Sequence, residues 1–361
     1  MGMNKMRLGR VIGGMRKFGF RRILVSAPNS IFYLTGLRVN PGERLFALII
    51  GENGDCALYA NRLFALTDPS DGYQIVQFDD ADDSVRILAN DLPSGALGVD
   101  KFWPAGFAIR LMEARPDIKL VMGSAPVDEA RMIKDETELA AQLDSAHIAD
   151  SCVAETIGLL RPGQTELDVS HMYAGIATAS GRTDGGTYMA LVCFGANCAE
   201  PHHNSDYTRL TDGDPVIIDT GVTVRGYASD ITRTVFLGSA TDEQKRVYDI
   251  VLKANLAAIA AVRPGTPLRD IDRAARRVIE DAGYGPFFLH RTGHGIGIDG
   301  HEPPDVGSHS EAIAAPGMSF SIEPGIYLPG RFGVRIEDIV SVTEDGCLVL
   351  NRLNKELTII K

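Results

Sequence analysis

Residues 290–304 read HRTGHGIGIDGHEPP, a stretch dense in glycine and histidine. Residues 295–300 within it fit the pattern G-x-G-x-x-G, which can form a loop around a dinucleotide phosphate. Such a loop needs a helix directly after it, because the helix N-terminus holds the phosphate. Pro303 and Pro304 follow instead, and consecutive prolines disfavour a helix. We therefore reject a dinucleotide loop and consider whether His294 and His301 carry the chemistry.

The composition limits the class of protein. A chain of 361 residues exceeds one typical core, so its length predicts two domains. The net charge of −11 argues against a nucleic-acid partner. No apolar run approaches the ~18 residues of a membrane span, and the start lacks a secretory signal, so we expect a cytoplasmic protein that does not bind membranes. The five cysteines are odd in number and scattered, which argues against a disulfide framework.

Residues 1–127 alternate short helical and strand-like patterns, which predict a small α/β domain. Asn53-Gly54 indicates a hairpin turn, because both residues tolerate positive φ. We expect helices at 10–18, 83–90 and 105–114, and strands at 22–26, 45–51, 56–60, 74–78 and 97–99.

Residues 128–160 are rich in alanine and charged residues and are periodic, so they predict one long helix that ends before Pro162-Gly163. We place the start of the second domain, 128–361, at this helix. Beyond it the chain repeats itself. Arg-Pro-Gly at 161–163 and at 263–265 each lead, at the same offset, into a helical pattern, at 169–180 and 271–282. Each half continues into strand-like segments, which favours two halves related by a pseudo-two-fold axis.

Four acids occupy matching places in the strand patterns of the two halves: Asp219 in 215–223, Asp230 in 227–237, Glu323 in 318–326 and Glu337 in 334–342. Each acid taken alone could be exposed, or paired with Arg233 or Arg335. Four acids in such apolar surroundings are harder to explain that way, because buried carboxylates are costly and repel one another. Cations remove both penalties. The pattern predicts a site for Mn²⁺, Co²⁺ or Zn²⁺, with room for two ions about 3.5–4 Å apart.

The histidines add nitrogen donors to this site. Glycines around His294 let the backbone approach a metal, so His294 is the candidate nitrogen ligand. His301 and His202 are candidate donors to a developing oxyanion, although His203 beside His202 leaves that assignment open. His290 either supports the site or packs in the core.

At these residues the sequence resembles the pita-bread metallopeptidases, and within them the Xaa-Pro peptidases, prolidase and aminopeptidase P. The motifs are IDTG at 218–221, SDITRT at 229–234, HRTGHGIG at 290–297, HE at 301–302, SIEPGIY at 321–327 and VRIED at 334–338. The resemblance covers 128–361, and NSIFYLTG at 29–36 and ARMIKDETEL at 130–139 extend it to the N-terminal part.

The resemblance implies an α+β protein, in which a pita-bread domain with internal pseudo-two-fold symmetry follows a smaller α/β domain of the creatinase N-terminal type. It implies two metal ions, and their ligands are Asp219, Asp230, His294, Glu323 and Glu337, with Asp230 and Glu337 bridging. His202 and His301 match histidines that assist catalysis. Arg335 matches an arginine that supports the bridging glutamate, and Tyr327 and His290 are expected nearby. A homodimer is also implied.

The implied function is hydrolysis of the peptide bond before proline by a hydroxide held between two divalent ions, with Mn²⁺ preferred over Co²⁺ or Zn²⁺. Glu323 would handle the proton as well as bind metal. The substrate would be a proline-containing dipeptide or longer peptide. Two alternatives stay open: a metal-dependent hydrolase or lyase of the same fold that acts on a small metabolite, and a non-catalytic binding homologue.

Overall fold

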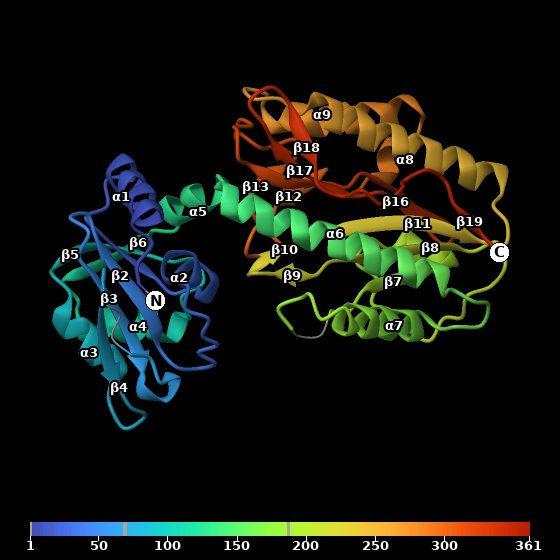
Figure 1. Cartoon of the computed structure of the whole chain (residues 1–361). Coiled ribbons are helices and arrows are strands. Elements are labelled where there is room, and N and C mark those ends of the chain that lie inside the picture. Colours follow the sequence, from blue (N-terminus) through green and yellow to red (C-terminus); the bar gives the residue numbers. More distant parts are fainter. Residues whose placement is uncertain (1, 68–70, 186–187) are drawn as a thin grey trace. The chain divides into compact units, whose positions relative to one another are not determined.

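The computed structural model describes residues 2–67, 71–185 and 188–361. The chain divides into two compact units, Met1–Arg131 and Met132–Lys361 (Figure 1). None of the helices in the described ranges combines the length and the apolar character that a bilayer crossing requires. Each unit is described by itself below.

The N-terminal unit is built on one six-stranded mixed sheet with the strand order β4-β3-β2-β1-β5-β6. Its elements are α1 Lys5–Phe18, β1 Arg22–Val25, α2 Pro28–Thr35, β2 Phe46–Gly51, β3 Cys56–Asn61, η1 Arg62–Phe64, β4 Gln74–Phe78, α3 Ser84–Asp91, β5 Gly95–Val99, α4 Ala105–Ala114 and β6 Ile118–Met122. Strands β2 and β3 form the antiparallel hairpin predicted around Asn53-Gly54. The sequence patterns missed α2 and β6.

The prediction of one helix over 128–160 is wrong. The structure has two helices, α5 Ala125–Met132 and α6 Glu136–Gly158. Ile133 between them leaves the helical path to form a β-bridge with Met318. Asp135 then starts α6 with a capping box, in which its carboxylate accepts from the Glu138 N–H at 2.9 Å and the Glu138 carboxylate accepts from the Asp135 N–H at 2.9 Å. This capping signal separates the two helices.

The C-terminal unit contains two main sheets, ordered β19-β11-β8-β7 and β13-β12-β14-β17-β18, and the ribbons β10-β9 and β15-β16. Its further elements are α7 Glu166–Ala179, β7 Leu191–Phe194, η2 Gly195–Ala199, β8 Pro215–Thr220, β9 Thr223–Val224, β10 Tyr227–Ala228, β11 Ile231–Leu237, α8 Asp242–Ala261, α9 Leu268–Asp281, η3 Gly285–Phe287, β12 Gly293–Gly295, β13 Glu302–Val306, β14 Ser319–Ile322, β15 Gly325–Leu328, β16 Phe332–Arg335, β17 Asp338–Val342, β18 Cys347–Val349 and β19 Ile359–Ile360. In Figure 1 its strands lie between α8 and α9 on one side and α7 on the other.

Apolar side chains bury each helix pair against its own sheet. In the first half, Val169 and Tyr173 of α7 join a buried cluster with Val192 of β7 and Ile218 of β8. In the second half, helices α8 and α9 contribute to a cluster that includes Phe320 of β14. These two cores hold the acid-bearing strands in fixed positions.

The two halves repeat the same local hydrogen bonding at their Arg-Pro-Gly turns. The Gly163 N–H donates to the Leu210 carbonyl at 2.8 Å, and the Gly265 N–H donates to the Ala314 carbonyl at 2.9 Å. Both glycines adopt positive φ, 86° and 87°. The predicted helices at 169–180 and 271–282 correspond to α7 and α9. The internal symmetry therefore extends to individual turns.

These matching turns give a stability test. A Cβ at Gly163 or Gly265 would meet no atom of the described residues within 4 Å, so the cost of alanine there is a backbone cost. We expect Gly163→Ala and Gly265→Ala to lower the free energy of unfolding by similar amounts, about 1–2 kcal/mol each. Gly175, exposed within α7, is the control, and Gly175→Ala should stabilise by about 0.5–1 kcal/mol. Urea denaturation followed by circular dichroism measures all three. A cost at only one of the two turns would contradict their equivalence.

Candidate metal centre

The four candidate acids lie at or beside breaks in paired strands. Each strand that the sequence predicted as continuous is split in two, and β8 pairs with β11 while β14 pairs with β17. Asp230 lies in the break between β10 and β11, Glu323 in the break between β14 and β15, and Glu337 in the break between β16 and β17. Asp219 lies near the end of β8, opposite Thr232.

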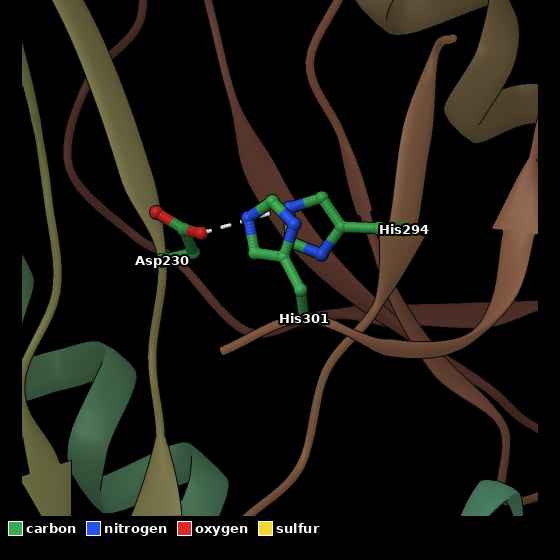
Figure 2. Close-up of side chains that lie close together, drawn as sticks. All are labelled: Asp230, His294 and His301. Carbon is green, nitrogen blue, oxygen red and sulfur yellow. Dashed lines mark ion pairs between the residues drawn. The ribbon is translucent and has the colours of Figure 1, made fainter. Parts of the chain in front are cut away.

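The candidate ligands converge. Three overlapping groups have potential ligand atoms within 4.8 Å of one another: Asp219 with Asp230 and Glu337, His294 with Glu323 and Glu337, and Asp230 with His294 and His301. His294 Nε2 lies 3.4 Å from Glu323 Oε1 and 3.8 Å from Asp230 Oδ2. Figure 2 shows Asp230 directed at the paired rings of His294 and His301. All five expected ligands thus lie in one place.

The protonation of His294 can be derived from its contacts. Nδ1 lies 3.1 Å from the Gly295 carbonyl, so this nitrogen carries the hydrogen. Burial, followed by the neighbouring His301, lowers the pKa of His294 to about 4, so the ring is neutral near pH 7. Its Nε2 lone pair therefore points toward the carboxylate oxygens of Asp230 and Glu323. The carboxylate oxygens and the Nε2 lone pair thus face one another with no hydrogen between them. A cation between these groups would stabilise the arrangement.

Hydrogen bonds from outside the cluster orient the acids. Thr232 Oγ1 donates to Glu337 Oε2 at 2.7 Å and accepts from Arg335 Nε at 3.2 Å. Arg335 Nη2 donates to Asp219 Oδ2 at 2.5 Å. Arg335 therefore reaches Glu337 through Thr232 and contacts Asp219 directly. Ser321 Oγ donates to Glu323 Oε1 at 3.1 Å and accepts from the His294 N–H at 3.0 Å.

His290 and Tyr327 support Arg335 from behind. His290 Nδ1 donates to the Arg291 carbonyl at 2.7 Å, and burial lowers the pKa of His290 to about 4. The neutral ring then accepts at Nε2 from the Tyr327 hydroxyl at 2.8 Å. Tyr327 in turn accepts from Arg335 Nη1 at 3.0 Å. This chain of contacts fixes the guanidinium that binds Asp219.

The carboxylates destabilise one another. Burial, followed by the charges of Asp219 and Glu323, raises the pKa of Asp230 well above its ordinary value. Burial, followed by the charge of Asp230, raises the pKa of Glu337 in the same way. Burial raises the pKa of Glu323 to about 7, although Arg335 opposes this shift. One guanidinium therefore does not compensate the charge of the cluster.

The donor set fits divalent cations. Ligand atoms bound at about 2.0–2.2 Å to one ion lie no more than roughly 4.4 Å apart, and the distances from His294 to Glu323 and Asp230 are within that limit. Carboxylate oxygens with one imidazole nitrogen suit Mn²⁺, Co²⁺ and Zn²⁺. The residues present can therefore hold the metal that the sequence predicted.

The cluster lies in a cleft of about 1020 Å³. His202 and His301 both line it and are exposed, as expected of groups that meet a substrate. The His301 ring stacks on His294 with centroids 3.6 Å apart, and its Nδ1 lies 3.4 Å from Arg291 Nη2. His203 is paired with Glu166 instead, with Nε2 2.8 Å from Glu166 Oε2. This contact supports His202 over His203 as the residue that faces the substrate.

The rejected dinucleotide loop is absent from this part of the described chain, because strand β13 rather than a helix follows Gly300. Sequence reasoning gave no role to Thr232, Ser321 and Arg291. Ser321 precedes Glu323 by two residues, and side chains two residues apart along a strand lie on the same face. This periodicity is the signal by which the sequence could have identified Ser321. His309 also lines the cleft, and its Nε2 lies 3.8 Å from Asp305 Oδ2.

Comparisons with known proteins show the family of this chain. Residues 141–344 match the model of metallopeptidase family M24, and residues 7–133 match that of the creatinase/prolidase N-terminal domain. "Probable dipeptidase PepE" of Mycobacterium bovis is 35% identical, over 95% of this chain and 92% of the relative. The solved prolidase of Thermococcus sibiricus superposes with a TM-score of 0.93 at 34% identity, over 99% of each chain. The Xaa-Pro dipeptidase of Bacillus anthracis gives 0.88 at 30% identity, over 98% of this chain and 99% of that one.

The fold and the site define a metal-dependent peptidase with a creatinase-type N-terminal domain. The chain belongs to metallopeptidase family M24. The predicted pita-bread fold, its N-terminal partner domain and the enzyme class are thereby confirmed.

The raised pKa of Glu323 predicts a pH effect in metal-free protein. A carboxyl whose folded-state pKa exceeds its unfolded value contributes stability below the unfolded pKa and loses it as pH rises through the folded one. For Glu323 that interval runs from its ordinary value of 4.5 to about 7. In chelator, Glu323→Gln should therefore stabilise the protein relative to wild type at pH 8 more than at pH 5.

Melting temperatures at both pH values measure this effect. Glu344→Gln, at an exposed position of the same unit, is the control. It should change the melting temperature by the same amount at pH 5 and at pH 8. A difference between wild type and Glu323→Gln that stays constant with pH would contradict the raised pKa of Glu323.

Proposed function

We propose that the chain hydrolyses the peptide bond before proline in Xaa-Pro dipeptides and uses two divalent cations to do so. The observation that carries the proposal is the convergence of Asp219, Asp230, His294, Glu323 and Glu337 in one cleft. The names of the similar solved proteins, prolidase and Xaa-Pro dipeptidase, supply the substrate class.

The overlap of the donor groups supports two ions rather than one. Glu337 belongs both to the group with Asp219 and Asp230 and to the group with His294 and Glu323. Asp230 joins the first group and lies 3.8 Å from His294 of the second. In this proposal Asp219 would hold one ion, His294 and Glu323 would hold the other, and Asp230 and Glu337 would contact both. Oxygen donors outnumber nitrogen donors here, which favours Mn²⁺.

The cations would lower the pKa of a bound water and polarise the scissile carbonyl. Glu323, whose carboxylate lies among the candidate metal ligands, would accept the proton of the attacking water. The same carboxyl then delivers that proton to the proline nitrogen, which has no N–H and must gain one to leave as a secondary amine. Proton uptake and release thus balance on one residue.

His301 and His202 stabilise the oxyanion that forms on the carbonyl. Arg291 donates to His301 Nδ1, which leaves the hydrogen on His301 Nε2. Burial, followed by the charge of Arg291, lowers the pKa of His301, so the ring acts as a neutral donor. Leu167, Met189 and Leu191 also line the cleft and provide apolar surface for the side chain of the substrate.

A substrate panel tests the reaction. We expect Mn²⁺-loaded enzyme to cleave Ala-Pro and Leu-Pro with kcat/KM at least about tenfold above that for Ala-Pro-Ala, and to leave Ala-Ala largely uncut. Amino acid release measured by chromatography gives the rates. Failure on every Xaa-Pro substrate would overturn the proposal and favour a small-metabolite substrate.

Ligand variants test the two-ion assignment. Glu337→Gln should reduce bound metal from about two ions per chain toward none, because Glu337 contacts both positions, whereas Asp219→Asn should keep about one. Both should lose more than about 100-fold in activity. Asp281→Asn, exposed at the end of α9, is the control. Elemental analysis after gel filtration measures metal content. Equal metal loss in both ligand variants would contradict the bridging role of Glu337.

We also propose a homodimer, as the sequence resemblance implied, and a cytoplasmic location, as the composition predicted. Light scattering on the purified full-length chain tests the oligomeric state, and a monomer at all concentrations would contradict it.

A further inference from the structure

The loop of residues 200–206, here called the His202 loop, is anchored on both sides of His202. Before it, the Pro201 carbonyl accepts from Arg335 Nη1 at 3.3 Å. After it, His203 Nε2 lies 2.8 Å from Glu166 Oε2. His202 itself makes no hydrogen bond or ion pair with the residues that the structure describes, and its side chain is exposed in the cleft. Its position is therefore set by its neighbours.

Glu166 is a fixed anchor. Its side chain is fully buried at the first residue of α7, where the helix dipole favours a negative charge. Oε1 accepts from the Phe194 N–H at 2.7 Å and from Asn197 Nδ2 at 2.9 Å. Oε2 accepts from the Asp206 N–H at 2.9 Å as well as from His203. Four donors compensate the burial of this carboxylate and connect β7, η2 and the His202 loop to α7.

Carboxylates on two sides of His203 favour the protonated form of its ring. Burial acts to lower the pKa of His203, but the hydrogen bond to Glu166 and its charge outweigh burial and raise it. His203 Nδ1 lies 3.5 Å from Glu200 Oε2, so both ring nitrogens face carboxylates. A charge-assisted hydrogen bond of this kind is stronger than a neutral one. Of the two adjacent histidines, His203 therefore holds the loop.

A cation is not required at this second cluster. Glu166, His203 and Asp206 have ligand atoms close enough to hold an ion. However, a carboxylate offers about four lone-pair positions, and the four donors listed above occupy all of those on Glu166. An ion would have to displace His203 and the Asp206 N–H. The cluster is thus a hydrogen-bonded connection.

We propose that Glu166 and His203 are positioning residues, which hold the His202 loop so that the His202 ring reaches the carbonyl oxygen of the substrate. The inference rests on the proposed function, in which His202 stabilises the oxyanion. A displacement of about 1 Å at such a group can cost on the order of 100-fold in rate. The pair acts through His202 and does not touch the reacting atoms.

Hydrogen–deuterium exchange tests the anchoring without any substrate. In His203→Ala, we expect amides of residues 200–206 to exchange about tenfold faster than in wild type, because one charge-assisted hydrogen bond is lost. His203→Gln can still donate to Glu166 and should stay near wild type. His171→Ala, at an exposed position of α7, is the control. Unchanged exchange in His203→Ala would overturn the proposal.

Kinetics test whether the pair acts through His202. His203→Ala should lower kcat about tenfold with little change in KM, and His203→Gln should restore kcat to within about twofold of wild type. In a His202→Ala background, adding His203→Ala should lower kcat by less than about a further twofold. Equal losses in both backgrounds, or a His203→Gln variant as slow as His203→Ala, would overturn the positioning role. If wild type cleaves no Xaa-Pro peptide, the proposed function fails, and the exchange result still decides whether His203 holds the loop.

Discussion

Mutual repulsion among buried carboxylates is the constraint on which this structure depends. Asp230, Glu323 and Glu337 have raised pKa values because they are buried close together, and Arg335 neutralises only part of their charge. The neutral ring of His294 directs another lone pair at the same point. Divalent cations convert this repulsion into coordination. The surrounding fold provides rigidity: helix pairs buried against each sheet keep the acids from moving apart.

The two halves reach this arrangement by the same means. Each places acids where paired strands break, and each begins with a turn in which Gly163 or Gly265 donates to a matching carbonyl. The support is asymmetric, however. Thr232 and Arg335 orient Glu337 and Asp219, whereas Ser321 orients Glu323 and His294. A symmetric scaffold thus carries an asymmetric set of hydrogen bonds to the candidate ligands.

The sequence predicted most of the C-terminal domain because its patterns are strong locally. Acids within apolar strands, the paired Arg-Pro-Gly turns and the proline pair after Gly300 each have a direct physical consequence. Failures occurred where tertiary contacts decided the outcome. The helix predicted over 128–160 is interrupted where Ile133 pairs with Met318, a tertiary contact, and the capping box of Asp135 and Glu138, a local signal that the prediction overlooked, then starts α6. The choice between His202 and His203 likewise depended on Glu166, which lies far from both in the sequence.

Anomalous X-ray diffraction from crystals grown with Mn²⁺ tests the central claim most directly. The account predicts two anomalous peaks about 3.5–4 Å apart, one contacting Asp219 and the other contacting His294 and Glu323, with Asp230 and Glu337 touching both. A single peak, or no peak among these side chains at saturating Mn²⁺, would contradict it.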